Sequence, residues 1–78
     1  MQTIRLNSTG PDVELLQQLL CKWGYKVNGT GVFDAETDAA VRKFQRDGRL
    51  DADGIVGKCT WDLLQNEDAR ALSSYRIN

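Results

Sequence analysis

Apolar residues recur every three or four positions in three stretches of the chain. The first stretch predicts a helix from about Pro11 to Trp23. Pro suits the first position of a helix because its missing N–H is not needed there. Gly10 is then the expected N-cap, and Gly24 is expected to end the helix in a left-handed conformation. The predicted inner face consists of Val13, Leu16, Leu19, Leu20 and Trp23.

The second stretch predicts a helix that begins after Asp34 and ends at Gly48. Asp is a strong N-cap, since its side chain can accept a hydrogen bond from a backbone N–H two or three residues later. The inner face of this helix is predicted to consist of Thr37, Ala40, Val41 and Phe44.

A third helix is predicted to begin near Lys58, with Gly57 as its N-cap and with Trp61 and Leu64 on its inner face. The same phase continues through Ala71, Leu72 and Tyr75, so this helix could run well past Gln65. The final "SSYRIN" is typical of a tail or of the start of a linker.

One short phrase occurs twice, as "GVFDAET" at 31–37 and as "GIVGKCT" at 54–60. Each Gly is expected to adopt a conformation that a β-carbon would forbid. The two apolar residues after it are expected to form a short antiparallel strand or to pack under the next helix. The closing Thr37 and Thr60 stand where a hydroxyl can bond back to the cap. The repeat therefore indicates one helix-entry device used twice, or a second loop whose exposed part contacts a ligand.

These elements predict an all-α fold, a small three-helix bundle with short loops or mini-strands between the helices. Residues 1–66 are expected to form one domain, and residues 67–78 a helix extension, a tail or the start of a linker.

Charge and composition narrow the possible functions. Ten Lys and Arg residues face eleven Asp and Glu residues, a balance that disfavours nucleic acid as a partner. The chain has no histidine, so Ser-His-Asp and Cys-His catalysis and His-containing zinc sites are excluded. No apolar run approaches the roughly 18 residues of a membrane span, and "MQTIRLNS" lacks the apolar core of a signal peptide. We therefore expect neither a membrane partner, nor a cofactor, nor an enzyme.

Four further residues raise questions of chemistry. Cys21 and Cys59 could be free or could form a disulfide, because their separation in space is not given by the sequence. The acidic pair Asp51 and Asp53 resembles part of a calcium loop, but the remaining ligand positions of an EF-hand are missing. Asp53 is expected instead to bond to the backbone of its own turn.

The ordered set of motifs resembles the peptidoglycan-binding domain of bacterial and phage cell-wall hydrolases. That family has the pattern "G…G-x-x-V-x-x-L-Q-x-x-L…G…G-x-F-x-x-x-T-x-x-A-V-x-x-F-Q…G-L-x-x-D-G-x-V-G-x-x-T-W-x-x-L". The matching residues span most of the chain and are Gly10, Val13, Leu16, Gln17, Leu20, Gly24, Gly31, Phe33, Thr37, Ala40, Val41, Phe44, Gln45, Leu50, Asp53, Gly54, Val56, Gly57, Thr60, Trp61 and Leu64.

A few residues depart from this pattern. Asn7 and Asp34 stand where the family often has Gly, and Arg49 replaces the Gly before Leu, so the turn after the second helix could differ. The fold also resembles the pro-segment of matrix metalloproteases, but "GKCTWD" does not match that family's inhibitory cysteine motif, and we discount that function.

The resemblance implies non-catalytic binding of peptidoglycan, through its glycan or its stem peptide, and a covalently linked hydrolase that is brought to its substrate. It implies a monomer located at the cell wall, or otherwise extracellular or periplasmic. The alternative is a module that packs on a neighbouring catalytic domain or another protein, for which exposed Ala71, Leu72 and Tyr75 would be the contact surface.

The candidate ligand-binding residues are Tyr25, Gln45, Asp53, Gly54, Ile55 and Thr60. Tyr25 could equally belong to the core, whereas Trp23 and Trp61 are expected to be core residues. Gln17 and Gln45 each follow an apolar helical residue, so their amides are expected to bridge helix and loop backbone, although they could also face a peptide ligand.

Overall fold

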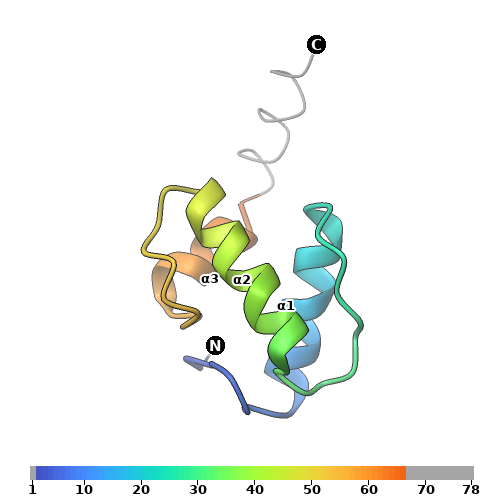
Figure 1. Ribbon diagram of the computed structural model, residues 1–78. Helices are drawn as coiled ribbons and strands as arrows, with labels where there is room; N and C mark the ends of the chain where they lie inside the picture. Colours follow the sequence, from blue (N-terminus) through green and yellow to red (C-terminus); the bar gives the residue numbers. More distant parts are fainter. Residues whose placement is uncertain (1, 67–78) are drawn as a thin grey trace.

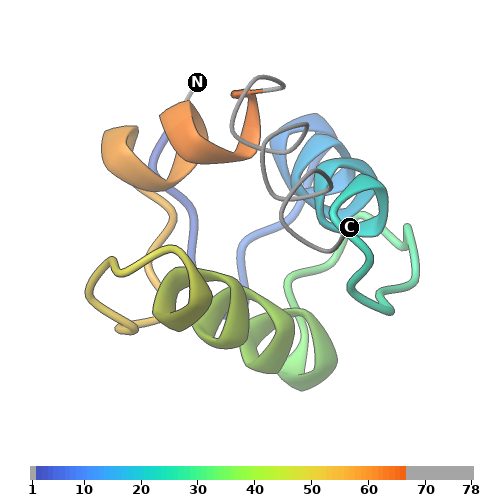
Figure 2. The same ribbon diagram turned by 90° about the horizontal axis from the view of Figure 1, so that it is seen from above.

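The computed structural model describes residues 2–66 and confirms the all-α, three-helix architecture (Figure 1). Helix α1 spans Pro11–Lys22, α2 spans Ala35–Asp47 and α3 spans Lys58–Leu64. Seen from above, the helices surround a common centre, and the N-terminal segment runs between them (Figure 2). In the part of the chain that is described, no helix combines the length and apolar character needed to span a membrane.

The predicted helix starts are confirmed. Gly10, Asp34 and Gly57 are the N-caps of α1, α2 and α3. The Asp34 carboxylate accepts a hydrogen bond of 2.9 Å from the backbone N–H of Thr37. This bond stabilises the charged form, so it lowers the pKa of Asp34 below its ordinary value.

Helix α1 ends in the arrangement that its sequence predicts. Gly24 has φ 96°, and its N–H donates to the Cys21 carbonyl at 3.0 Å. The next N–H, that of Tyr25, donates to the Leu20 carbonyl at 3.0 Å. These two bonds form a Schellman motif, in which a left-handed residue turns the chain away from the helix.

Helix α2 ends in the same motif, but the left-handed residue is not its glycine. Gly48 is the C-cap with φ −86°, whereas Arg49 has φ 61°. The N–H groups of Arg49 and Leu50 donate to the carbonyls of Arg46 and Gln45 at 3.1 and 2.7 Å. A β-carbon at Gly48 would collide with the Leu63 side chain, so glycine at this position permits the end of α2 to pack against α3.

The N-terminal segment ties together the two loops that contain the repeated phrase. Ile4 and Val56 form an antiparallel bridge with reciprocal backbone bonds of 3.2 and 2.8 Å. A second antiparallel bridge joins Thr9 to Val32. In the first repeat Val32 lies in the bridge and its neighbour Phe33 is fully buried. In the second repeat Val56 is both bridged and fully buried. Both expected roles, pairing and packing, are therefore present, and the loops pair with the N-terminal segment in both cases.

The core confirms the predicted inner faces of the three helices. Trp61 is buried, and its indole N–H donates to the Gln2 carbonyl at 3.0 Å. Trp23 packs against the core and donates to the Leu64 carbonyl at 2.9 Å. The buried hydrophobic residues are Ile4, Val13, Leu16, Leu20, Val27, Phe33, Val41, Phe44, Val56, Trp61 and Leu64.

The predicted continuation of the third helix lies outside the described residues, as does the assignment of 67–78 to an extension, tail or linker. Ala71, Leu72 and Tyr75 belong to this part of the chain. Within the described residues α3 ends at Leu64, with Gln65 as its C-cap.

Candidate functional site

Two buried glutamines connect each of the first two helices to the loop that leads into the next helix. Gln17 of α1 and Gln45 of α2 are 0% and 1% exposed. A buried amide needs partners for both its oxygen and its nitrogen, because an unpaired polar group in the interior is costly. Both amides find these partners in the repeated loops, and the predicted bridging of helix and loop is confirmed.

Gln45 holds the loop that enters α3. Its Oε1 accepts from the Gly54 N–H at 3.0 Å, and its Nε2 donates to the Ile55 carbonyl at 2.9 Å. The same Nε2 lies 3.2 Å from Thr60 Oγ1 and 3.3 Å from Asp53 Oδ1. One side chain thus fixes the loop backbone against the first turn of α3.

Gln17 repeats this network at the entry to α2. Its Oε1 accepts from the Gly31 N–H at 2.9 Å, and its Nε2 donates to the Val32 carbonyl at 3.1 Å and to Thr37 Oγ1 at 3.0 Å. Gly31 and Gly54 have nearly the same φ, 76° and 77°. The hydroxyls of Thr37 and Thr60, which were expected to bond back to the cap, accept hydrogen bonds from Gln17 and Gln45.

The loop held by Gln45 forms one wall of a groove of about 330 Å³ against the start of α3. Four of the six candidate residues line it, and a fifth, Gly54, lies buried in the adjoining backbone. The structure therefore brings together most of the predicted site. The full lining is Gln45, Leu50, Asp51, Asp53, Ile55, Gly57, Lys58, Cys59 and Thr60.

The lining residues differ in how much of their chemistry is available to a ligand. Ile55 is 37% exposed and presents an aliphatic surface. Thr60 is 4% exposed, and its hydroxyl already accepts from Gln45. Asp53 Oδ1 accepts from the Ile55 N–H at 2.9 Å, which confirms the predicted bond to its own turn. Direct contact of these residues with a ligand stays a prediction.

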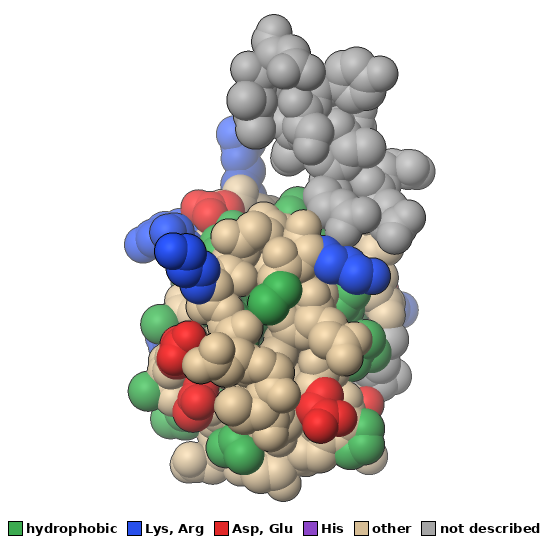
Figure 3. Space-filling model, turned by 90° about the vertical axis from the view of Figure 1, so that its right-hand side faces the viewer, with side chains coloured by type: hydrophobic (Ala, Val, Ile, Leu, Met, Phe, Trp, Pro, Cys, Tyr) green, Lys and Arg blue, Asp and Glu red, His purple; other side chains and the backbone are tan. Residues whose placement is uncertain are grey.

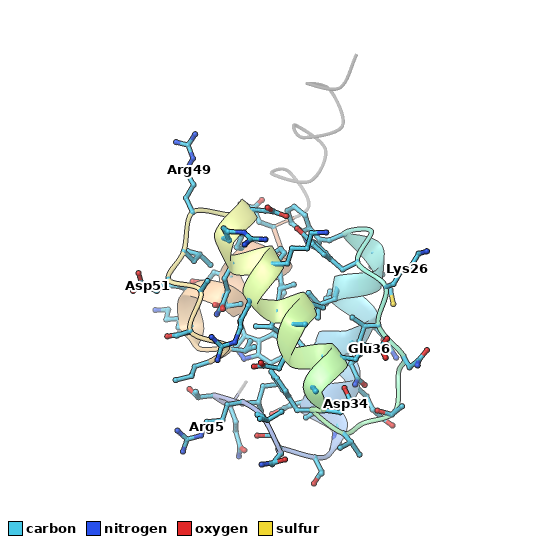
Figure 4. All side chains as sticks on the ribbon, in the orientation of Figure 1. Arg5, Lys26, Asp34, Glu36, Arg49 and Asp51 are labelled. Atoms are coloured by element: carbon cyan, nitrogen blue, oxygen red, sulfur yellow. The ribbon has the colours of Figure 1, made fainter. Side chains whose placement is uncertain are left out.

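Tyr25, the sixth candidate, is not in this groove. It lines a second groove of about 440 Å³ between the 24–26 segment and α2. Figure 4 shows this separation, with Lys26 on one side of α2 and Asp51 on the other. The Tyr25 hydroxyl donates to Asp47 Oδ2 at 2.6 Å. Partial burial, followed by this bond and the charge of Asp47, raises the pKa of Tyr25 above its ordinary value.

Five residues of the groove lining were not among the candidates. They are Leu50, Asp51, Gly57, Lys58 and Cys59. The sequence predicted Gly57 as an N-cap and Lys58 as the start of the third helix, and gave none of the five a ligand-binding role. Their closeness follows from the fold of the loop back over α3, and the only available signal was their position within the second copy of the repeated phrase or shortly before it.

The two cysteines are free and exposed. Cys59 lines the groove, whereas the Cys21 thiol, in α1, donates to the Val27 carbonyl at 3.1 Å. Among residues 2–66, no three His, Cys, Asp or Glu side chains are grouped so as to hold a metal ion.

The face formed by α1 and the following connection has no single chemical character. In Figure 3, basic side chains lie in the upper part of this face and most acidic ones lower down, with small hydrophobic areas scattered among tan atoms. Such isolated apolar residues are normal on a protein surface.

Known proteins share both the sequence pattern and this fold. Residues 9–64 match the family model described as "Putative peptidoglycan binding domain". The carboxy-terminal processing protease CtpA of Bacillus subtilis is 31% identical over 72 residues, which cover 92% of this chain but 16% of that protein. The chain thus spans about a sixth of this curated relative.

Two crystal structures show how the fold occurs elsewhere. The Burkholderia AP3 phage endolysin is 36% identical with a TM-score of 0.82, over 85% of this chain and 26% of the endolysin. The SleB N-terminal domain is also 36% identical, with a TM-score of 0.79, over 88% of this chain and 93% of that domain. The match is therefore to a part of the endolysin and to nearly all of the SleB domain. Because the family model matches residues 9–64 and the three-helix fold is shared with these structures, the chain belongs to the peptidoglycan-binding domain family.

Proposed function

We propose that this domain binds peptidoglycan of the bacterial cell wall, catalyses no reaction itself, and brings a covalently linked hydrolase to its substrate. The observation that supports this most directly is the similarity to the AP3 phage endolysin, in which the matched region is only 26% of the chain. A fold that forms a minor part of a lytic protein is suited to attachment. The proposal places the protein at the cell wall, outside the cytoplasmic membrane, as a monomer.

The groove beside α3 is the proposed contact surface. It joins an aliphatic side chain, Ile55, to polar atoms from the loop and from the first turn of α3. Its wall is fixed by buried hydrogen bonds, so little conformational freedom is lost when a ligand binds. The proposed ligand-binding residues are Tyr25, Gln45, Asp53, Gly54, Ile55 and Thr60, of which Tyr25 would have to serve a separate contact across α2.

The alternative function, packing on a neighbouring domain, depended on Ala71, Leu72 and Tyr75. These residues lie outside the described part of the chain, so the structure adds nothing in its favour.

Sedimentation with purified insoluble peptidoglycan tests the proposal. We expect the protein to sediment with cell walls from at least some bacteria, and Ile55→Asp to weaken binding because it places a charge on the aliphatic part of the groove. Val32→Asp is the matched control, since Val32 is the counterpart of Ile55 in the first repeat, is 45% exposed and does not line this groove. A protein that stays in the supernatant with every wall preparation, salt and pH would refute the proposal.

The targeting step needs a separate measurement. A hydrolase with this domain attached should release wall fragments faster than the same hydrolase alone, with equal rates on a small soluble substrate. Equal rates on intact walls would leave binding in place and remove the targeting role.

A further inference from the structure

We propose that the groove beside α3 binds the stem peptide of peptidoglycan and not its glycan strand. This inference rests on the proposed function and concerns which part of the polymer is recognised. It is drawn from the side chains that line the groove.

The apolar part of the groove is aliphatic. Leu50 and Ile55 contribute to it, and Ile55 is one of three large hydrophobic residues in the described chain that are well exposed. No aromatic side chain is among the lining residues. Proteins commonly bind sugars by stacking the flat C–H face of the ring on an aromatic ring, and this groove offers no such platform. Short aliphatic side chains instead suit the methyl groups of alanine residues.

The charged part of the groove carries both signs. Asp51 and Asp53 lie on the loop wall, and Lys58 lies at the start of α3. A stem peptide carries carboxylates and the amine of a dibasic residue, whereas the sugars of the strand carry no charge once the peptide is attached. Opposite charges on the two walls therefore complement a peptide that carries both signs, and they add orientation more than affinity.

The hydrogen bonds that hold the loop wall do not involve the exposed side chains of Asp51 and Lys58. Asp53 uses one carboxylate oxygen inward, toward the Ile55 N–H and Gln45 Nε2. Asp51 and Lys58 are exposed. Their charges can therefore be changed with little effect on the fold, which makes them the residues to test.

The experiment uses the full 78-residue chain labelled with ¹⁵N and three probes. The probes are insoluble peptidoglycan, a soluble stem tetrapeptide with its dibasic residue, and a tetrasaccharide of the strand whose lactyl carboxyl groups are capped as simple amides, so that it is uncharged as in the polymer. Amide chemical shifts report where each soluble probe binds. We expect the tetrapeptide to shift resonances of residues 50–60 and the tetrasaccharide to leave them unchanged.

Charge variants give the second readout. Asp51→Asn and Lys58→Gln should each weaken tetrapeptide binding by about two- to fivefold, the range expected for an exposed ion pair. Lys43→Gln is the matched control, because Lys43 is an exposed lysine that lines the groove on the Tyr25 side. Preserved amide spectra would show that each variant is folded.

The possible outcomes separate the two proposals. Binding of the tetrasaccharide in place of the peptide would overturn the inference and leave the proposed function standing. So would binding of insoluble peptidoglycan with neither soluble probe, or a loss of affinity in Lys43→Gln but not in Lys58→Gln. Failure to bind insoluble peptidoglycan would remove both.

Discussion

Replacing Gln45 with methionine should remove a large part of the stability of this domain. Methionine has a similar length and no hydrogen-bonding amide, so the change leaves the buried Gly54 N–H and the Thr60 hydroxyl without their partner. Each buried polar group that loses its partner costs roughly 1–3 kcal/mol. The Ile55 carbonyl lies nearer the surface, where water can replace the amide. We therefore expect a loss of about 3 kcal/mol, against a total of about 4–12 kcal/mol for a domain of this size.

The duplicated network provides the matched experiment. Gln17→Met removes the equivalent bonds to Gly31 and Thr37, so it should cost about the same as Gln45→Met. Gln18→Met changes an exposed glutamine of the same helix and should cost less than about 0.5 kcal/mol. Urea unfolding followed by circular dichroism measures the free energy of unfolding of all three variants. In thermal unfolding, the melting temperature of either buried variant should fall by about 12–24 °C.

Function should separate the two buried variants. Only Gln45 holds the wall of the groove beside α3, so under conditions where both variants are folded Gln45→Met should bind peptidoglycan more weakly than Gln17→Met. A cost below about 1 kcal/mol for either variant would contradict the reasoning from buried bonds. Equal binding by both would mean that the groove does not depend on the loop.

Three further changes test individual conformations. Arg49→Gly should stabilise the domain by about 0.5–1 kcal/mol, because it relieves a left-handed residue at φ 61° at some cost in unfolded-chain entropy; urea unfolding that shows a loss would contradict this. Gly54→Ala should cost about 2 kcal/mol of stability, and more than Gly31→Ala. The new β-carbon at position 54 would lie 2.5 Å from Asp38 Oδ1, whereas the one at position 31 would lie 3.1 Å from the Glu14 side chain. Equal melting temperatures of the two variants would refute this ranking. The lowered pKa of Asp34 means that its stabilisation is fully present above the ordinary pKa of about 4 and is lost as the pH falls through the folded pKa. Asp34→Asn should therefore show a smaller loss of stability between pH 5 and pH 2 on acid titration, and identical titrations would contradict the cap's role.

The helices could be predicted because their signals are local. Spacing of apolar residues, Pro11 after Gly10, and Asp34 before a helical run each act within a few positions. The groove required long-range information. Tyr25 was predicted to lie near the same groove as the other candidates, yet α2 separates it from them.

Other features depended on exact backbone geometry. The sequence predicted that the second helix ends at Gly48, but it did not show that the left-handed residue would be Arg49 or that Gly48 would be needed for close packing against Leu63. The bridging role of Gln17 and Gln45 was foreseeable from their place on the helices, whereas their acceptors were not. Those acceptors come from residues up to twenty positions away, and their identity follows only when the loops fold over the helices.

The N-terminal segment has a consequence for where this domain should be cut from a longer polypeptide. The match to the family model begins at residue 9, and a boundary drawn from that match alone would start there. Such a fragment would lack Ile4, which pairs with Val56, and the Gln2 carbonyl, which receives the Trp61 indole N–H. Trp61 would keep its burial pocket only in part and would hold an indole N–H without its acceptor. Any fused sequence is therefore best joined ahead of Gln2, since the residues before the family match pair with the loop that enters α3 and supply the acceptor for Trp61.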